Sequence, residues 1–289
     1  RRASSDTWNQ ALGQIAVKGN NEEEKVKFYS ALYNAHFLPR TFSDTDGSYP
    51  KFDGGEQIMK MDHGTYYCDF SQWDTYRAVH PLFSILNPTR NGDMAHSLVL
   101  KGQQGGWLPI FPSWNSYTAA MIGDHCIAMI GDAIVKDAPG FDYEEAYTLM
   151  RKNAFEANTD SNSYRDGKGR RAMESYLKYN YVPLEDPVME AFHRREQVSR
   201  TLEYAYDDWA IYKLGQALGK PESEIAIFAK HAMNYKNLFD KETKLMRGRN
   251  ADGTFQSPFN PLKWGDAFTE GNSWHYTWSV FHDPQGLID

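Results

Sequence analysis

Residues 197–238, QVSRTLEYAYDDWAIYKLGQALGKPESEIAIFAKHAMNYKNL, decide the fold class of this 289-residue chain. The first half of the stretch has apolar side chains at helical spacing, namely Val198, Leu202, Ala205, Trp209, Tyr212 and Leu214. Gly219 and Pro221 predict a tight turn, with the glycine just past one helix and the proline at the first position of the next. The second half repeats the apolar spacing at Ile225, Phe228, Ala229, Ala232 and Leu238. Two helices joined in this way predict an αα-hairpin.

The same helical pattern recurs along the rest of the chain. Further helices are predicted over Glu22–His36, Gln72–Leu86, Gly92–Lys101 and Ser116–Lys136, and another is predicted from a capping box at Asp142 and Glu145 to about Ala157. Alternating β-branched runs are nearly absent, so strand evidence is thin. The sequence therefore predicts an all-α fold of helical hairpins packed around a common axis.

Two long connections interrupt this helical pattern, at Leu38–Phe70 and Arg247–Trp274. Both are rich in Gly, Asp, Asn and aromatic residues. Because long loops in compact domains are usually functional or disordered, this composition favours ordered loops that carry function.

Composition excludes several classes of function. The 31 basic and 38 acidic residues give a net charge of −7, which argues against a nucleic-acid partner. No apolar run is long enough for a membrane span, and residues 1–10 contain no signal peptide. Aromatic residues make up 15% of the chain, and many of its eight tryptophans adjoin Gly, Pro, Asn or Asp. These rings are either the walls of a sugar-binding cleft or loop-packing residues.

Metal and phosphate motifs are absent or incomplete. Asp44-Thr45-Asp46-Gly47 resembles the start of a calcium loop, but Tyr49 and Gly55 stand where an EF-hand needs glycine and glutamate. An Asx-type turn is the better interpretation, and no metal-ligating residue is predicted.

Carboxylates beside aromatic residues are the stronger candidates for chemistry. Glu270 lies in Thr269–Tyr276, TEGNSWHY, where neighbouring rings could desolvate it and allow it to donate a proton. A role in capping a backbone amide is the alternative. Asp74 follows Trp73 and precedes Arg77, so it is either a site residue or an ordinary acid of a first helical turn. Of the adjacent Asp207 and Asp208, at most one is expected to face the interior, with the other solvated.

Five ordered motifs resemble those of the family-92 glycoside hydrolases across essentially the whole chain. They are Tyr67–Arg77, Gly105–Pro109, Trp114–His125, Thr201–Trp209 and Thr269–Tyr276. The resemblance implies a calcium-dependent, inverting exo-α-mannosidase acting on mannose-rich glycans, with an (α/α)6 toroid as its catalytic domain. It implies that Glu270 is the general acid, that Trp73 and Asp74 contact the terminal mannose, and that Trp107 and His275 line the cleft.

Residues 1–289 lack part of the family pattern. The resemblance places the general base and most calcium ligands C-terminal to Asp289, and a β-sandwich domain before residue 1. Residues 1–289 are therefore expected to be an incomplete catalytic domain, completed by the remainder of a longer, secreted or periplasmic protein or by a second copy. The alternative is a non-catalytic carbohydrate-binding or scaffold fragment of a helical-toroid glycosidase.

Overall fold

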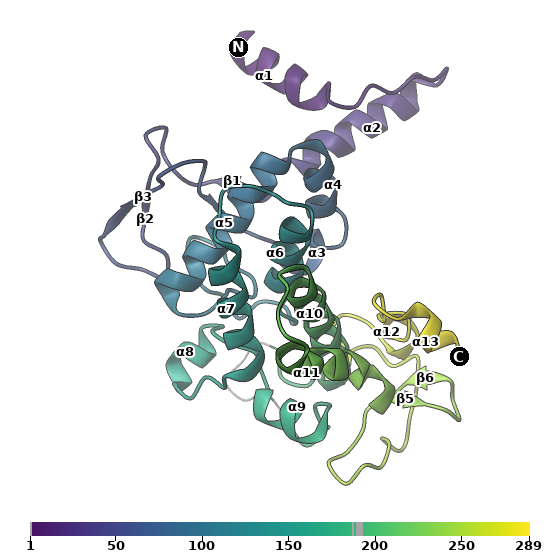
Figure 1. The fold of residues 1–289 in the computed structure, drawn as a ribbon. Helices are drawn as coiled ribbons and strands as arrows, with labels where there is room; N and C mark the ends of the chain where they lie inside the picture. Colours follow the sequence, from purple (N-terminus) through teal and green to yellow (C-terminus); the bar gives the residue numbers. More distant parts are fainter. Residues whose placement is uncertain (1, 187, 189–192) are drawn as a thin grey trace.

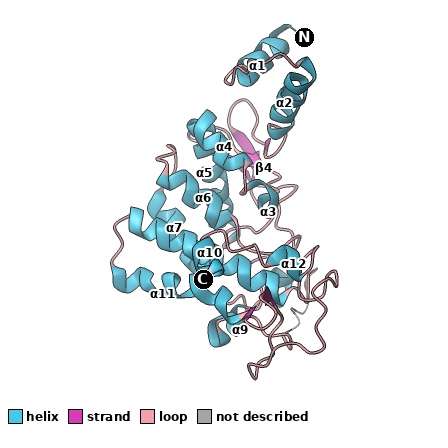
Figure 2. Ribbon diagram, turned by 90° about the vertical axis from the view of Figure 1, so that its right-hand side faces the viewer, coloured by secondary structure: helices cyan, strands magenta, loops and turns pink. Residues whose placement is uncertain are grey.

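The computed structural model describes residues 2–186, 188 and 193–289, and these residues are mainly helical (Figures 1 and 2). The α-helices are α1 Arg2–Leu12, α2 Glu22–Ala35, α3 Gln72–Thr75, α4 Val79–Leu86, α5 Pro88–Gly105, α6 Cys126–Val135, α7 Tyr143–Phe155, α8 Ser161–Arg165, α9 Met173–Tyr179, α10 Gln197–Ala217, α11 Glu222–Ala232, α12 Ser273–Tyr276 and α13 Pro284–Ile288, with a 3-10 helix, η1, at Met233–Asn237. Three small antiparallel sheets pair β1 Arg40–Thr41 with β4 Tyr67–Cys68, β2 Ser48–Pro50 with β3 Ile58–Lys60, and β5 Phe239–Asp240 with β6 Leu245–Met246.

The hairpin predicted from residues 197–238 is present as α10 and α11, which pack against each other. Gly219 ends α10 in the left-handed conformation, with φ +67°. The Gly219 amide donates to Gln216 O at 3.1 Å and the Lys220 amide to Gly215 O at 2.8 Å, which is the Schellman arrangement. Pro221 is the N-cap of α11 rather than its first helical residue, a shift of one position.

Helix α10 is the central element, and it contacts α6, α7, α11 and η1 (Figure 1). Its N-terminal half contributes Val198 and Leu202 to an apolar cluster with the β5–β6 region and α12. Its C-terminal half contributes Ile211 and Leu214 to a larger cluster built on α4, α5, α6 and α7. Polar residues of α10 between these contributions are therefore held at the junction of two cores.

Three predicted helix boundaries are wrong. The Gln72–Leu86 segment is two helices, because the chain turns at residues 76–78. In the Ser116–Lys136 segment only Cys126–Val135 is helical, since Met121 and Gly123 have positive φ angles of 61° and 79°. The Gly92–Lys101 segment is instead the longer α5, which has Asn87 as its N-cap.

Both long connections are ordered. The Leu38–Phe70 segment contains β1–β4, so the strands that the sequence barely indicates lie mostly here. Within it, Asp46 accepts a hydrogen bond from the Ser48 amide at 2.9 Å, which confirms the predicted Asx-type turn.

Helices α1 and α2 extend away from the rest of the chain in both ribbon views (Figures 1 and 2). Among their residues only Leu32 is buried. No helix of the described ranges combines the length and the apolar character that crossing a membrane requires.

Candidate active site

Ser199, Glu203 and Asp207 are spaced four residues apart on α10, so their side chains lie on one face of the helix, one turn apart. All three are buried, with relative exposures of 0%, 4% and 0%. Two segments that the sequence predicts to form the site are each anchored to this face.

The first segment is α3, which carries Trp73 and Asp74. The Trp73 indole Nε1 donates to Glu203 Oε1 at 3.3 Å. Arg77 lies over the Trp73 ring at 5.0 Å, and its Nη2 is 4.0 Å from the same Glu203 oxygen. Asp74 is exposed and accepts from Ser71 Oγ at 2.5 Å. Glu203 therefore fixes the indole, while the Asp74 carboxylate keeps access to a ligand.

The second segment is the loop at residues 265–272. The Thr269 amide donates to Ser199 Oγ at 2.9 Å, and the Val198 amide donates to Ala267 O at 3.0 Å. The Gly265 amide closes the loop on Gly271 O at 2.8 Å. Glu270, at the tip, has a positive φ of 46°. A non-glycine residue costs about 1 to 3 kcal/mol in such a sparsely populated conformation, and such residues cluster at functional sites.

Ser199 and Glu203 thus hold the Glu270 loop and the Trp73–Asp74 pair one helical turn apart, although these segments are separated by almost 200 residues. Tyr276 is buried, and this burial, followed by the Glu203 carboxylate, raises the pKa of its hydroxyl. Glu270 itself is exposed. In the described part of the chain, the aromatic residues next to Glu270 in the sequence do not shield its side chain from solvent, contrary to the expectation that they would desolvate it.

The structure gives His275 and Trp107 structural contacts. His275 is the third residue of a capping box at α12, where its amide donates to Asn272 Oδ1 and its Nδ1 accepts from the Asn272 amide, both at 3.2 Å. Its ring also meets Trp264 edge-on at 5.8 Å. Trp107 lies below the Lys152 ammonium, at 4.6 Å, and beside Gly169. The described contacts of Trp107 do not reach Trp73 or the Glu270 loop.

His125 lies behind Glu203, between two carboxylates. Its Nδ1 is 2.9 Å from Asp207 Oδ1, and its Nε2 is 2.5 Å from Glu203 Oε2 in an ion pair that lacks good hydrogen-bond alignment. Burial lowers the pKa of His125, but Asp207 and Glu203 outweigh burial and raise it to about 10. The imidazole is therefore charged at neutral pH. Its ring stacks on Tyr76 at 4.0 Å, next to Arg77.

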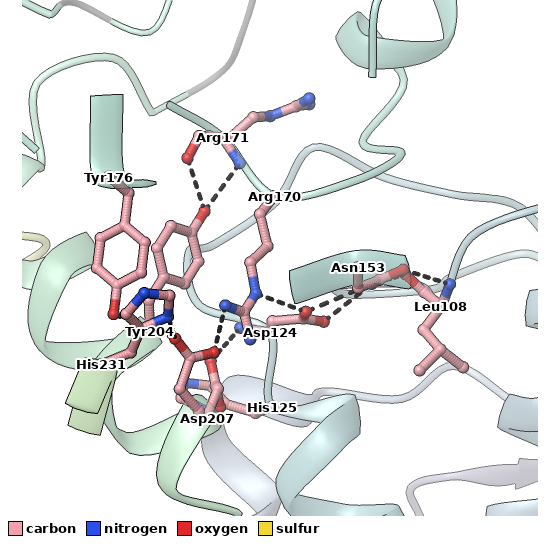
Figure 3. Close-up of polar contacts among 11 residues, drawn as sticks. Leu108, Asp124, His125, Asn153, Arg170, Arg171, Tyr176, Tyr204, Asp207 and His231 are labelled. Atoms are coloured by element: carbon pink, nitrogen blue, oxygen red, sulfur yellow. Dashed lines mark hydrogen bonds and ion pairs between the residues drawn. The ribbon is translucent and has the colours of Figure 1, made fainter. Parts of the chain in front are cut away.

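The prediction that Asp207 or Asp208 is solvated is wrong, because both are fully buried. Arg170, from the connection between α8 and α9, explains how this is possible. Its Nη1 is 2.6 Å from Asp208 Oδ1. Its Nε is 2.9 Å from Asp124 Oδ2 (Figure 3). Asp208 is also 3.2 Å from His231 Nδ1, and the Asp124 amide donates to Asp207 at 2.7 Å. Burial is the first cause that raises the pKa of Asp124, and Arg170 opposes it.

These carboxylates do not form a calcium site. Glu203, Asp207 and Asp208 are paired with His125, Arg170 and His231. Within the described part of the chain, no group of three or more acidic, histidine or cysteine side chains is arranged to hold a metal ion. The described carboxylates therefore do not fit a calcium ion.

A sequence model of the glycosyl hydrolase family 92 catalytic domain matches residues 1–289. The chain belongs to glycosyl hydrolase family 92. Among solved structures, its fold is similar to that of the family GH92 alpha-mannosidase BT3965 from Bacteroides thetaiotaomicron, with 36% identity and a TM-score of 0.87 over 99% of this chain. That enzyme has also been solved in complex with mannoimidazole. The family GH92 inverting mannosidase BT2199, from the same species, is 34% identical with a TM-score of 0.88 over 99% of this chain.

A curated relative from Arthroderma benhamiae, an uncharacterized secreted glycosidase, is 24% identical over 92% of this chain. The family 92 chain described here spans only about a third of these relatives' lengths: 36% of BT3965, 37% of BT2199 and 30% of the fungal protein.

Sequence reasoning did not single out Glu203, His125 or Arg170. Glu203 and His125 lie inside the motifs Thr201–Trp209 and Trp114–His125. Glu203 precedes Asp207 by one helical turn, so the sequence already indicates that the two carboxylates share one face of the helix. Arg170 lies outside those motifs, in an irregular connection whose spatial partners no local pattern indicates.

Proposed function

We propose that this chain is part of an exo-α-mannosidase that removes terminal α-mannosyl residues from mannose-rich glycans with inversion. The observation that supports the proposal is the anchoring of the Thr269–Glu270 loop and the Trp73–Asp74 pair to adjacent turns of α10. Membership of family 92 and the mannosidase neighbours support the substrate class. The mannoimidazole complex of BT3965 supports a mannose-shaped pocket.

In this proposal Trp73, Asp74 and Glu270 act directly on the sugar. The Trp73 ring packs against the C–H face of the terminal mannose, and the Asp74 carboxylate accepts hydrogen bonds from its hydroxyls. Trp107 and His275 are proposed as further cleft residues. Glu270 gives its proton to the glycosidic oxygen as the bond to the anomeric carbon breaks. A water molecule attacks the opposite face of the ring, and a second carboxylate takes its proton.

Two requirements of this mechanism call for chain outside residues 1–289. A general acid needs surroundings that disfavour its charged form, whereas Glu270 is exposed here. The base of an inverting glycosidase lies about 6.5–9.5 Å from the acid, across the sugar. Since the relatives are about three times as long, we propose that other segments cover Glu270 and supply the base.

The remaining expectations belong to the same proposal. Residues 1–289 form the catalytic domain's helical hairpins, and additional hairpins complete an (α/α)6 toroid preceded by a β-sandwich domain. The full-length protein is proposed to use calcium, held mainly by residues outside positions 1–289. Secretion is supported by the name of the fungal relative.

The test is Glu270→Gln in the full-length protein, assayed on two substrates. Hydrolysis of a mannobiose, whose leaving group needs protonation, should lose most of its rate, by at least about 100-fold. Hydrolysis of an activated aryl mannoside should lose much less, because its leaving group departs without a proton. Glu242→Gln, an exposed glutamate in the β5–β6 turn, is the matched control. Equal losses on both substrates would exclude the acid role.

A further inference from the structure

Trp73 and Asp74 lie on a helix that is too short to hold its orientation without tertiary contacts. Helix α3 has only four residues, and its N-cap, Ser71, makes no side-chain capping hydrogen bond. Isolated helices of this length are not stable in water, so the orientation of the indole depends on tertiary contacts. For the polar edge of the Trp73 ring, that contact is the Glu203 carboxylate at 3.3 Å.

The two carboxylate oxygens of Glu203 contact different partners. Oε1 faces the candidate site, where it accepts from Trp73 and lies 4.0 Å from Arg77. Oε2 faces the interior, 2.5 Å from His125. The carboxylate is 4% exposed, too enclosed to meet a sugar freely, and each oxygen already has a partner. It therefore acts on residues rather than on substrate.

The groups behind Glu203 keep it in place. His125 is held from its other side by Asp207 at 2.9 Å, and its ring is stacked on Tyr76 at 4.0 Å. Tyr76 in turn supports the Arg77 guanidinium, 4.7 Å above its ring. Charge-assisted contacts in a dry environment are stronger and more directional than neutral ones. Glu203 and the stacked Tyr76 therefore fix α3 and Arg77 at separate points.

We propose that Glu203 is a positioning residue of the glycosidase site, which fixes the Trp73 indole and the Arg77 guanidinium so that Trp73 and Asp74 meet the sugar in one orientation. This inference rests on the proposed function, because it assumes that Trp73 and Asp74 bind the substrate. His125 and Asp207 act one step further back, by orienting Glu203.

The test is a double-mutant cycle in the full-length protein. Trp73→Phe keeps an aromatic wall but removes the indole donor. Glu203→Gln offers one oxygen and one NH₂ group, so it cannot accept from both Trp73 and His125. Each single variant should raise KM for an aryl mannoside about tenfold, the effect of losing a hydrogen bond to a charged group, with kcat changed less than threefold. Because both act through one contact, the double variant should be no worse than about tenfold.

Multiplying effects, about 100-fold in the double variant, would overturn the positioning role while leaving the proposed function intact. An unchanged KM in Trp73→Phe would also overturn the positioning role, because this variant loses the donor to Glu203 and keeps the aromatic ring. Trp73→Ala removes the ring itself, and an unchanged KM in that variant would count against the sugar-binding role of Trp73, and with it the proposed function. Glu196→Gln is the control, because this glutamate stands at the N-cap position of the same helix and pairs with His193 and Arg200 instead of with Trp73 or Arg77. Its KM should stay at the wild-type value.

A second variant covers the case in which Glu203→Gln does not fold. Glu203→Asp keeps a charge opposite His125 but is one methylene too short to span both partners. It should raise KM about tenfold while the protein still unfolds in one cooperative thermal transition. A wild-type KM in Glu203→Asp would overturn the proposal.

Discussion

Replacing Arg170 with methionine would leave the carboxylates of Asp124 and Asp208 buried without the guanidinium that pairs with both. The three side chains are 0% exposed, and the two contacts are 2.9 and 2.6 Å long. Removing one partner of a buried ion pair costs about 3–5 kcal/mol, because the remaining charges are neither solvated nor neutralised. Asn153 and His231 partly satisfy the two acids, so we expect the lower part of this range, about 3 kcal/mol.

Thermal unfolding of the full-length protein measures this cost. With about 2–4 °C per kcal/mol for a domain of this size, Arg170→Met should lower the melting temperature of the catalytic domain by roughly 6–12 °C. The triple variant Arg170→Met, Asp124→Asn, Asp208→Asn removes the unpaired charges, and it should recover at least half of the loss.

Lys27→Met is the control for loss of a positive charge. Lys27 pairs with Glu23 and Glu24 on the exposed face of α2, and such surface pairs contribute little. A triple variant less stable than Arg170→Met alone would refute the reasoning, because it would show that the cost comes from lost packing or hydrogen bonds rather than from uncompensated charge.

Two further predictions concern α10 and the His125 imidazole that pairs with it. The folded-state pKa of His125, about 10, lies above its unfolded value of 6.5, so its contribution to stability is complete below pH 6.5 and is lost as the pH rises to 10. In urea titrations, the free energy of unfolding of the wild type should therefore fall by on the order of 5 kcal/mol relative to that of His125→Gln over this range. Parallel pH profiles of the two proteins would contradict this. Burial lowers the pKa of Lys101 to about 7, which has the opposite effect on stability, but both proteins contain Lys101, so the comparison cancels it. Ser199→Ala removes the acceptor of the buried Thr269 amide and should cost about 1–3 kcal/mol and lower kcat on mannobiose, whereas unchanged stability and kcat would show that the Glu270 loop is held without it.

The helical hairpin at residues 197–238 was predictable because its apolar spacing and its terminal glycine are local signals. Gly219 adopts the expected conformation, and four of the six apolar residues of the predicted stripe are buried, namely Val198, Leu202, Ala205 and Leu214. The irregular chain before Cys126 was not predictable. Its backbone is held by a contact distant in the sequence, the hydrogen bond from the Asp124 amide to Asp207. Local secondary-structure propensities cannot predict such a bond.

The segments that carry Trp73, Asp74 and Glu270 are anchored to α10, and the roles of these residues in the site stay predictions. Motif resemblance singles these three residues out. It did not predict that Asp207 and Asp208 are both buried, because adjacent acids on a helix are normally solvated. Their burial requires Arg170 and His125, which come from two other segments and neutralise them.

The most direct test of the central claim is a crystal structure of the full-length protein with mannoimidazole. The account predicts that the inhibitor ring lies against Trp73, that the Asp74 carboxylate accepts from its hydroxyls, and that Glu270 lies within hydrogen-bond distance of the imidazole nitrogen that replaces the glycosidic oxygen. An inhibitor bound out of reach of both Trp73 and Glu270 would contradict it.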